Sequence, residues 1–249
     1  MHGFDPLESF GEDVAATYDD ALRGDEAETV EFLRGLAGNG PALELAIGTG
    51  RIGLPLAHTG VRVDGIEQSA AMIERLKSKP GGAQMSVVQA DMADVSVSGE
   101  YALVFVVFNS IYNLITQEDQ VRCFANVAMH LAPDGAFVVE AALPGVGEAE
   151  PGPQYRLEQQ YVAAEQVEAN RVVLDVGRYD QSSQLLSRCR IIVESGHVRL
   201  APIALRFAAP AELDLMARLA GLRLDTRWSG WRGEPFTATS RRHVSLYRR

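Results

Sequence analysis

Three glycines, Gly48, Gly50 and Gly53, follow an apolar run and form the pattern G-x-G-x-x-G, and Glu67 lies about 20 residues after the first of them. A glycine turn after a strand lets a ligand approach the backbone closely, and a carboxylate at the end of the next strand can bind a ribose diol. The pattern occurs in NAD-dependent oxidoreductases. Because any ribose-containing ligand at a strand-to-helix turn uses the same residue types, the pattern alone leaves the ligand open.

Three neighbouring features favour S-adenosylmethionine, which also carries adenine and ribose, over a dinucleotide. Glu44 lies within the first strand, four residues before Gly48, where dinucleotide-binding folds usually keep an apolar residue. Asp91 and Met92 end the third strand and offer a carboxylate for the adenine amine and an apolar surface for its ring. A helix and a tyrosine-bearing segment precede the first strand, whereas many dinucleotide domains begin at the strand itself.

Alternating strand-like and helix-like segments would hold these residues in place. Strands are predicted at 41–47, 61–67, 84–90, 101–108 and 136–142. Helices are predicted at 25–37, 51–58, 70–78 and 117–131, the third of them capped by Ser69. Strands separated by helices indicate a parallel sheet with helices on both faces.

The pattern changes after Pro144. Three or four strand-like runs follow without helices between them, at 155–165, 171–180, 185–194 and 197–207. Their polar and apolar alternation predicts an antiparallel sheet with one solvated face. A helix at 210–220 and strands at 222–228 and 242–248 come after them. The predicted fold class is therefore α/β, with a doubly wound, mostly parallel seven-stranded sheet and an antiparallel β insertion before the last helix.

Composition limits the partners. The chain has 23 Lys and Arg against 33 Asp and Glu, a formal net charge of -10, which disfavours nucleic acid. No signal peptide is visible at the start, and the longest apolar run, 102–108, is too short to span a bilayer. We expect a cytoplasmic monomer or homodimer without nucleic-acid or membrane partners. Cys123 and Cys189 match no metal-ligand spacing and are expected to be buried thiols, so no metal site is predicted.

Several motifs, in the right order and spread over nearly the whole chain, resemble those of the class I S-adenosylmethionine-dependent methyltransferases of the small-molecule type. Residues 44–50 resemble the family's E/D-x-G-x-G-x-G motif, with Ala46 in place of the first glycine. Residues 131–135 resemble its L-x-P-G-G turn, with Asp134 in place of a glycine. The other matching segments are 14–19, 63–69 followed by Met72, 90–92 and 106–110.

The resemblance implies a Rossmann-like methyltransferase fold, S-adenosylmethionine as cofactor and S-adenosylhomocysteine as product. It implies that 1–40 form an N-terminal segment and helix over the cofactor site. The segments 41–145 and 208–249 would form the cofactor-binding core, and 146–207 an insertion that covers the acceptor site. The implied cofactor-binding residues are Tyr18, Glu44, Ala46, Gly48, Gly50, Arg51, Glu67, Gln68, Met72, Asp91, Met92, Asn109 and Ser110.

The expected activity is in-line methyl transfer to a small-molecule acceptor, by N- or O-methylation of an amine, amino sugar or natural product. Tyr18, Asn109, Tyr112 and His197 are the catalytic candidates. No convincing His–Asp pair is visible, which favours an amine acceptor because an amine needs less help from a base. The alternatives are a non-catalytic regulatory protein that binds the cofactor or its product, and an NAD-dependent oxidoreductase.

The insertion would select the acceptor. His197 and Tyr179 are the first candidates for residues that face the acceptor pocket. Four arginines of the insertion could bind an anionic acceptor or decorate the solvated face of the sheet; they are Arg171, Arg178, Arg188 and Arg190.

Overall fold

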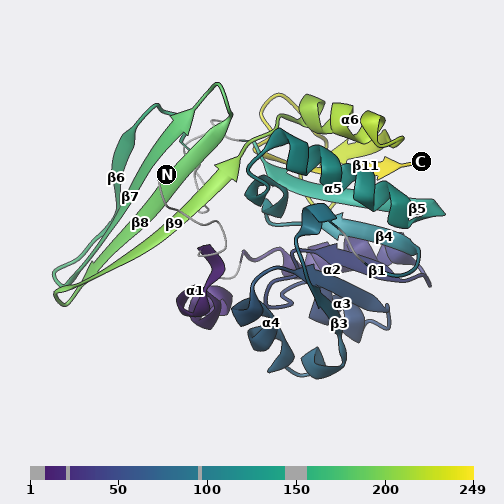
Figure 1. The fold of residues 1–249 in the computed structure, drawn as a ribbon, viewed down its shortest axis with the longest axis horizontal. Helices are drawn as coiled ribbons and strands as arrows, with labels where there is room; N and C mark the ends of the chain where they lie inside the picture. The colour runs from purple at the N-terminus through teal and green to yellow at the C-terminus, as the bar shows by residue number, and fades with distance from the viewer. Residues whose placement is uncertain (1–8, 21–22, 95–96, 144–155) are drawn as a thin grey trace.

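The structure is a computed structural model that describes residues 9–20, 23–94, 97–143 and 156–249. Within these residues the strands form one seven-stranded and one four-stranded sheet (Figure 1). The order across the large sheet is β10 (Arg223–Trp228), β11 (Arg242–Arg248), β5 (Leu131–Ala142), β4 (Tyr101–Val106), β1 (Ala42–Leu45), β2 (Val63–Glu67) and β3 (Ser86–Gln89).

The large sheet is mostly parallel, as predicted. The neighbouring pairs among β1 to β5 are all parallel, whereas β11 is antiparallel to both β5 and β10. The strand order reverses between β1 and β4, and at such a switch point the carboxyl ends of the strands leave a crevice for ligands. The residues that follow β1, β2, β3 and β4 should therefore meet at one edge of the sheet.

Helices cover both faces of the large sheet. They are α1 (Glu12–Thr17), α2 (Glu26–Ala37), α3 (Gly53–His58), α4 (Ala70–Lys77), α5 (Gln117–His130) and α6 (Pro210–Leu219). Short 3-10 helices are η2 (Tyr18–Asp20), η3 (Gly82–Gln84), η4 (Met92–Asp94) and η5 (Ser110–Asn113). Ser69 caps α4 as predicted, because its side chain accepts a hydrogen bond from the backbone N–H of Met72.

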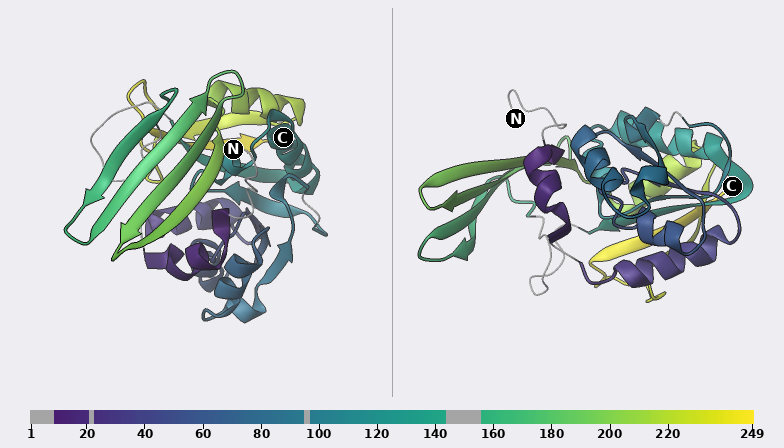
Figure 2. Two further views of the ribbon diagram at one scale, coloured as in Figure 1. Left: turned by 60° about the vertical axis from the view of Figure 1, so that its left-hand side comes forward. Right: turned by 90° about the horizontal axis from the view of Figure 1, so that it is seen from below.

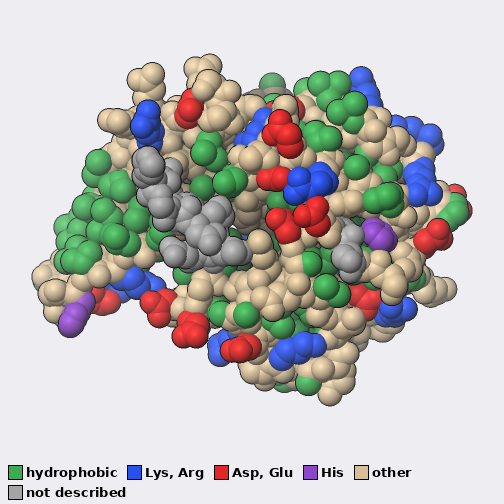
Figure 3. Space-filling model, in the orientation of Figure 1, with side chains coloured by type: hydrophobic (Ala, Val, Ile, Leu, Met, Phe, Trp, Pro, Cys, Tyr) green, Lys and Arg blue, Asp and Glu red, His purple; other side chains and the backbone are tan. Residues whose placement is uncertain are grey.

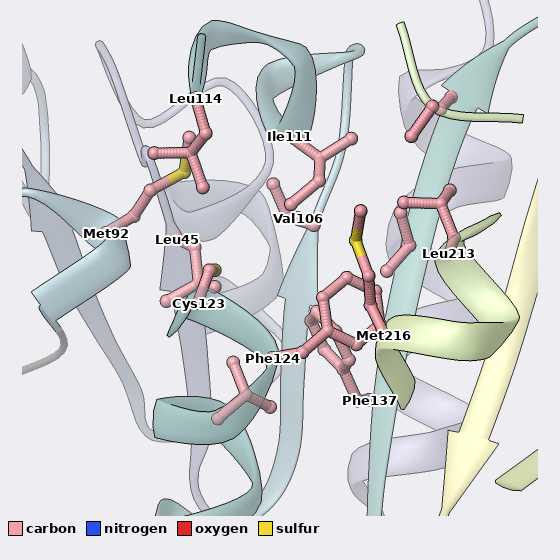
Figure 4. Close-up of a cluster of buried hydrophobic side chains, with 14 of the residues drawn as sticks. Leu45, Met92, Val106, Ile111, Leu114, Cys123, Phe124, Phe137, Leu213 and Met216 are labelled. Atoms are coloured by element: carbon pink, nitrogen blue, oxygen red, sulfur yellow. The ribbon is translucent and has the colours of Figure 1, made fainter. Parts of the chain in front are cut away.

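The central strands are apolar on both faces because each face packs against its own helices. On β4, Val104 and Val106 pack into the cluster that contains α5 and α6, whereas Leu103 and Phe105 pack into the cluster that contains α2 and α3. Figure 4 shows part of the first cluster, including Phe124 of α5, Phe137 of β5 and Met216 of α6. The core therefore fixes β4 and β5, which carry one wall of the crevice.

The insertion forms a separate antiparallel sheet in the order β6 (Tyr161–Val167), β7 (Arg171–Asp180), β8 (Leu185–Glu194) and β9 (His197–Arg206). It stands beside the main body of the molecule, and α1 lies next to it (Figure 2). Strands β7, β8 and β11 have the predicted ranges. Strand β6 begins at Tyr161 rather than at 155, and α5 ends at His130 because Leu131 already pairs with Tyr101 at the start of β5.

Two further expectations concern membrane-spanning helices and the burial of the two cysteines. None of the helices in the described residues has the length and apolarity to cross a membrane. Both cysteines have free thiols; Cys123 is buried, but Cys189 is half-buried, so the expectation of two buried thiols was wrong for it.

Candidate active site

A cavity of about 460 Å³ lies at the carboxyl ends of β1 to β4, within the usual size range of small-molecule sites. Of the predicted cofactor residues it is lined by Tyr18, Ala46, Gly48, Glu67, Gln68, Met72, Asp91, Met92, Asn109 and Ser110. Glu44, Gly50 and Arg51 do not line it. The residues Ser9, Phe10, Asn113, Leu114, Ile115 and Asp119 and the β9 segment Ile203, Ala204 and Leu205 also line the cavity.

Glu67 joins the two turns that form the floor of the cavity. Its Oε2 accepts a hydrogen bond from the backbone N–H of Gly48 at 2.8 Å, and its Oε1 accepts one from Ser69 at 2.8 Å. Burial raises the pKa of Glu67, while the N–H groups of Ser69 and Gly48 oppose the shift. The carboxylate is thus held in one orientation at the cavity wall, where it can accept hydrogen bonds from ligand hydroxyls.

The third glycine of the opening pattern serves packing rather than ligand contact. A Cβ at Gly53 would lie 2.6 Å from Oε2 of Glu44, which is buried beneath the turn. Burial raises the pKa of Glu44 well above its ordinary value; the backbone N–H of Gly53 opposes this shift, and the charge of Glu67 adds to it. Glu44 therefore supports the turn from below.

The turn itself contains a strained residue. Ala46 has a φ of +53°, a left-handed conformation that side chains with a Cβ rarely adopt, and it stands where the family motif has glycine. Gly48 and Gly50, at φ +57° and +78°, adopt this region without a steric cost. Gly50 is further restricted because a Cβ there would lie 2.8 Å from the side chain of Leu54.

We expect Ala46→Gly to stabilise the protein. The left-handed conformation costs a residue with a Cβ about 1–2 kcal/mol, and the extra freedom of unfolded glycine offsets about 0.5–1 kcal/mol of that gain. The free energy of unfolding should rise by up to about 1.5 kcal/mol, or up to about 3–6 °C in Tm, measured by thermal and denaturant unfolding. The control is Ala57→Gly in α3, which should destabilise the helix by about 1 kcal/mol. If Ala46→Gly and Ala57→Gly lowered the free energy of unfolding by the same amount, Ala46 would not be strained.

Apolar and acidic residues after β2 and β3 form the wall expected for adenine. Met72 and Met92 are buried and line the cavity. Asp91 turns back on its own loop, because its Oδ1 accepts a hydrogen bond from the N–H of Ala93 at 2.8 Å. Gln68 is exposed and lines the cavity beside Glu67.

The end of β4 is held by β5 through a buried acid that sequence reasoning missed. Phe108 and Asn109 both have positive φ, +57° and +65°. Glu140 of β5 accepts hydrogen bonds from the N–H of Phe108 at 2.6 Å and from two nitrogens of Arg23 at 2.7 and 3.1 Å. Asn109 Oδ1 accepts the N–H of Ala142 at 2.5 Å. The single acid within the apolar run 136–142 was the available signal for this support.

The N-terminal segment is fastened to the glycine turn. Asp19 accepts hydrogen bonds from the hydroxyl of Thr49 at 2.7 Å and pairs with Lys79 at 2.8 Å. Arg51 donates to the carbonyl of Tyr18 and stacks on its ring, with its guanidinium carbon 4.6 Å from the ring centroid. Arg51 therefore positions Tyr18 instead of lining the cavity, and Asp19 is a second supporting residue that sequence reasoning missed.

Two catalytic candidates reach the cavity and two do not. Tyr18 and Asn109 line it, whereas Tyr112 is fully buried in the core, where its hydroxyl donates to the carbonyl of Ala142 at 2.8 Å. His197 is exposed at the start of β9, about 20 Å along the strand from Ile203, which lines the cavity. The aromatic character of Tyr112 and the turn position of His197 gave no information on which way each residue faces.

The insertion also departs from the expectation at Tyr179 and Arg188. Tyr179 is half-buried against the core and does not line the cavity; Ile203, Ala204 and Leu205 do. Arg188 is buried and pairs with Asp175 at 2.7 Å and with Glu165 at 2.9 Å. Arg190 pairs with Glu165 at 2.7 Å and Arg171 pairs with Glu194 at 2.9 Å, and both arginine side chains are partly exposed.

Comparisons with known proteins decide between the ligands. The sequence profile of the methyltransferase domain family matches residues 42–135. The CcbJ methyltransferase of Streptomyces caelestis superposes with a TM-score of 0.87 and is 34% identical, covering 98% of this chain and 99% of that one. The chain belongs to the class I S-adenosylmethionine-dependent methyltransferases. The interpretations as an NAD-dependent oxidoreductase and as a non-catalytic protein are therefore wrong.

Two further relatives resemble this methyltransferase. The cypemycin N-terminal methyltransferase of a Streptomyces species is 26% identical over 207 residues, 83% of this chain and 82% of the relative. The amino pentose methyltransferase CalS10 of Micromonospora echinaspora, solved with S-adenosylmethionine bound, shares the fold with a TM-score of 0.66 at 20% identity, covering 94% of this chain and 95% of that one.

Proposed function

We propose that this methyltransferase methylates an amine nitrogen of a small natural-product acceptor. The observation that carries the proposal is the chemistry of the cavity wall: among the described residues that line it there is no histidine, lysine or cysteine. Its carboxylates already have partners, because Glu67 and Asp91 accept backbone N–H groups and Asp119 pairs with Arg122 at 2.9 Å. An amine becomes a nucleophile once its lone pair is free, whereas a hydroxyl benefits from a placed base. The names of the cypemycin and amino pentose methyltransferases both indicate amine acceptors, which supports the same choice.

The cavity fits S-adenosylmethionine in size and in the chemistry of its wall. We infer that the carboxylate of Glu67 accepts hydrogen bonds from the ribose hydroxyls and that Asp91 and Met92 contact the adenine. The backbone of Ala46 and Gly48 would lie along the methionine part. The bound cofactor supplies a methyl group activated by a positively charged sulfur.

Tyr18 and Asn109 would align the acceptor and exclude water instead of moving a proton. Burial raises the pKa of Tyr18, against the opposing charge of Arg51, so its hydroxyl stays protonated at neutral pH and can donate a hydrogen bond. Asn109 is held by the N–H of Ala142. Alignment of a nucleophile with a reactive centre can contribute about 7–11 kcal/mol to lowering the barrier, so a wall whose carboxylates are engaged with other groups is sufficient for an amine.

The test is a methyl-transfer screen with radiolabelled S-adenosylmethionine against amines, amino sugars, phenols, sugar hydroxyls and carboxylates. We expect labelled products from amine-bearing compounds, with the label on nitrogen by mass spectrometry. Label found on oxygen or carbon acceptors, and on no amine, would contradict the proposal.

We propose that β9 forms the acceptor wall and predict that Ile203→Ala and Leu205→Ala change kcat/KM for the acceptor by about tenfold or more, because methylene-sized changes in an apolar pocket shift selectivity by about 10–200-fold. The Kd for S-adenosylhomocysteine, measured by calorimetry, should change much less. His197→Ala, at the exposed end of the same strand, is the matched control and should retain turnover. A loss of turnover in His197→Ala equal to that in Ile203→Ala would place the acceptor elsewhere.

A further inference from the structure

The four-stranded sheet of the insertion turns its charged face towards the main body. Arg188 and Asp175 lie on that face and are buried, and Ile203, the cross-strand partner of Arg188, lines the cavity. The opposite face includes Val162 and Leu200, which are exposed, and Figure 3 shows hydrophobic side chains gathered over this sheet at the left of the molecule. The prediction of one solvated face was therefore wrong in its chemistry, because the polar face is the one that is covered.

The sheet meets the main body where β9 ends. Arg206 is the last residue of β9 and directly follows Leu205, which lines the cavity. Arg206 is only 4% exposed although it carries a charge. Removal of a guanidinium from water costs free energy, which close hydrogen-bonding partners must offset. The partners of Arg206 therefore show to which elements the end of β9 is fastened.

Three side chains from three segments accept hydrogen bonds from Arg206. Its Nη1 donates to Oε1 of Gln120 on α5. Its Nη2 donates to Oε1 of Gln184, in the turn between β7 and β8, at 2.6 Å and pairs with Oε1 of Glu212 on α6 at 2.7 Å. One planar guanidinium thus holds the end of β9 against two helices of the main body and against the neighbouring hairpin of the insertion.

Gln120 extends this network to the opposite wall of the cavity. It is fully buried, and its Nε2 donates to the carbonyl of Arg206 at 3.0 Å and to the carbonyl of Ile111 at 3.2 Å. Ile111 belongs to η5, whose Ser110 and Asn113 line the cavity. A single glutamine therefore connects β9 with η5, so the two walls are held in one fixed relation.

Glu212 is fastened as well. Its carboxylate accepts hydrogen bonds from Nε2 of Gln117 at 2.6 Å and from Nε2 of Gln184 at 3.0 Å, in addition to the pair with Arg206. Burial alone would raise the pKa of Glu212, but hydrogen bonds from Arg206, Gln117 and Gln184 bring it below its ordinary value. Glu212 is therefore ionised at neutral pH, and the guanidinium keeps a charged partner.

We propose that Arg206 is a positioning residue that sets the selectivity for the methyl acceptor, because it fixes the β9 wall, Ile203 and Leu205, relative to η5. This inference rests on the proposed function of β9 as the acceptor wall. The side chain of Arg206 bonds to Gln120, Gln184 and Glu212, none of which is among the proposed cofactor residues. A shift of β9 should therefore change the space for the methyl acceptor and leave the cofactor in place.

The chain offers a matched control for the loss of a buried arginine. Arg227 of β10 pairs with Asp214 at 2.6 Å, and Asp214 lies on α6, the helix that also carries Glu212. The side chains of the control pair are 12% and 20% exposed, against 5% and 19% for Arg206 and Glu212. Both pairs should therefore contribute similarly to stability, whereas the network of Arg206 alone reaches the cavity walls.

The first experiment measures steady-state kinetics of the full chain for Arg206→Lys and Arg227→Lys, with the amine of highest turnover in the radiolabel screen as methyl acceptor. Lysine keeps the charge but lacks the planar fork that reaches three partners. We expect Arg206→Lys to raise KM for this amine by about tenfold or more and to lower kcat less, with a Kd for S-adenosylhomocysteine within about threefold of the wild type. Arg227→Lys should leave both kinetic constants near the wild-type values.

The variants also separate this inference from the function on which it rests. An unchanged KM in Arg206→Lys, together with a reduced kcat/KM in Ile203→Ala, would overturn the positioning role and leave β9 as the acceptor wall. An unchanged kcat/KM in both variants would overturn both proposals. Equal rises of KM in Arg206→Lys and Arg227→Lys would also contradict the inference, because a general loss of stability would then explain them.

Hydrogen–deuterium exchange of the complexes with S-adenosylhomocysteine gives a readout that needs no methyl acceptor. In Arg206→Lys, exchange should become faster at 203–207 and in η5 while β10 keeps its wild-type rate, because local opening depends on local contacts. Arg227→Lys should have the reverse effect. Exchange in Arg206→Lys that stays at the wild-type rate, or that rises equally in η5 and β10, would show that Arg206 does not fix the two cavity walls.

Discussion

Glu67→Ala is expected to raise the Kd for S-adenosylhomocysteine from about tenfold to more than a hundredfold, since a hydrogen bond to a charged group contributes about 1.5–3 kcal/mol. The carboxylate is bonded to the N–H groups of Gly48 and Ser69, so the substitution removes both the proposed ribose contact and the link that orients the two turns. Isothermal titration calorimetry on the purified variant measures the loss.

Glu67→Ala should lower the free energy of unfolding less than it lowers the free energy of binding to S-adenosylhomocysteine. Two backbone N–H groups lose their acceptor, but removal of a carboxylate whose pKa is raised by burial relieves part of its desolvation. Glu67→Gln is the matched control: it keeps an acceptor oxygen for one of the two N–H groups, so its affinity should lie between those of the wild type and Glu67→Ala. Unchanged affinity in a folded Glu67→Ala protein would remove Glu67 from the cofactor site.

The second large effect is expected for Glu140→Ala, which should lower the free energy of unfolding by about 2–4 kcal/mol. Breaking a buried ion pair costs about 3–5 kcal/mol, and the figure is reduced here because the Arg23 side chain is 25% exposed. The substitution also removes the acceptor for the N–H of Phe108, which holds a left-handed turn at the cavity.

Glu140 is thus a positioning residue, and its variants separate stability from positioning. Glu140→Gln can still accept the N–H of Phe108, so it should lose stability while retaining more turnover than Glu140→Ala. The control is Glu194→Ala, which breaks an exposed pair with Arg171 and should cost less than about 1 kcal/mol. Chemical denaturation and kcat at saturating substrates measure the two effects. A cost for Glu140→Ala no larger than that of the control would contradict its supporting role.

The local sequence pattern was sufficient to predict the large sheet and the residues that follow its strands. Apolar runs of strand length, the glycine turn and the cap at Ser69 are set by neighbours in the sequence, so the cavity wall around Glu67, Asp91 and Asn109 could be predicted. Those side chains follow parallel strands, and the carboxyl ends of parallel strands meet at one edge of the sheet.

The features that were not predicted from the sequence have a common physical origin. They depend on contacts between residues that are distant in sequence. The partner of Glu140 is Arg23, 117 residues away, and Glu44 lies under the turn because Gly53 leaves space for it. Whether Tyr112 faces the cavity or the core is decided by how η5 packs against β5 and the segment after β9. Likewise, the covered face of the insertion depends on how the two sheets meet, which alternation along a strand does not specify.

Strand β9 separates two groups of residues on its two sides. Val198 and Leu200 are 65% and 62% exposed on one side of the strand, whereas Ile203 and Leu205 reach the cavity. Under the proposal that β9 forms the acceptor wall, changes at the cavity positions would alter substrate range and leave the solvent-facing positions as they are. Enzymes that diverge in acceptor can therefore keep the same insertion sheet, and directed evolution of this strand can vary its cavity positions alone.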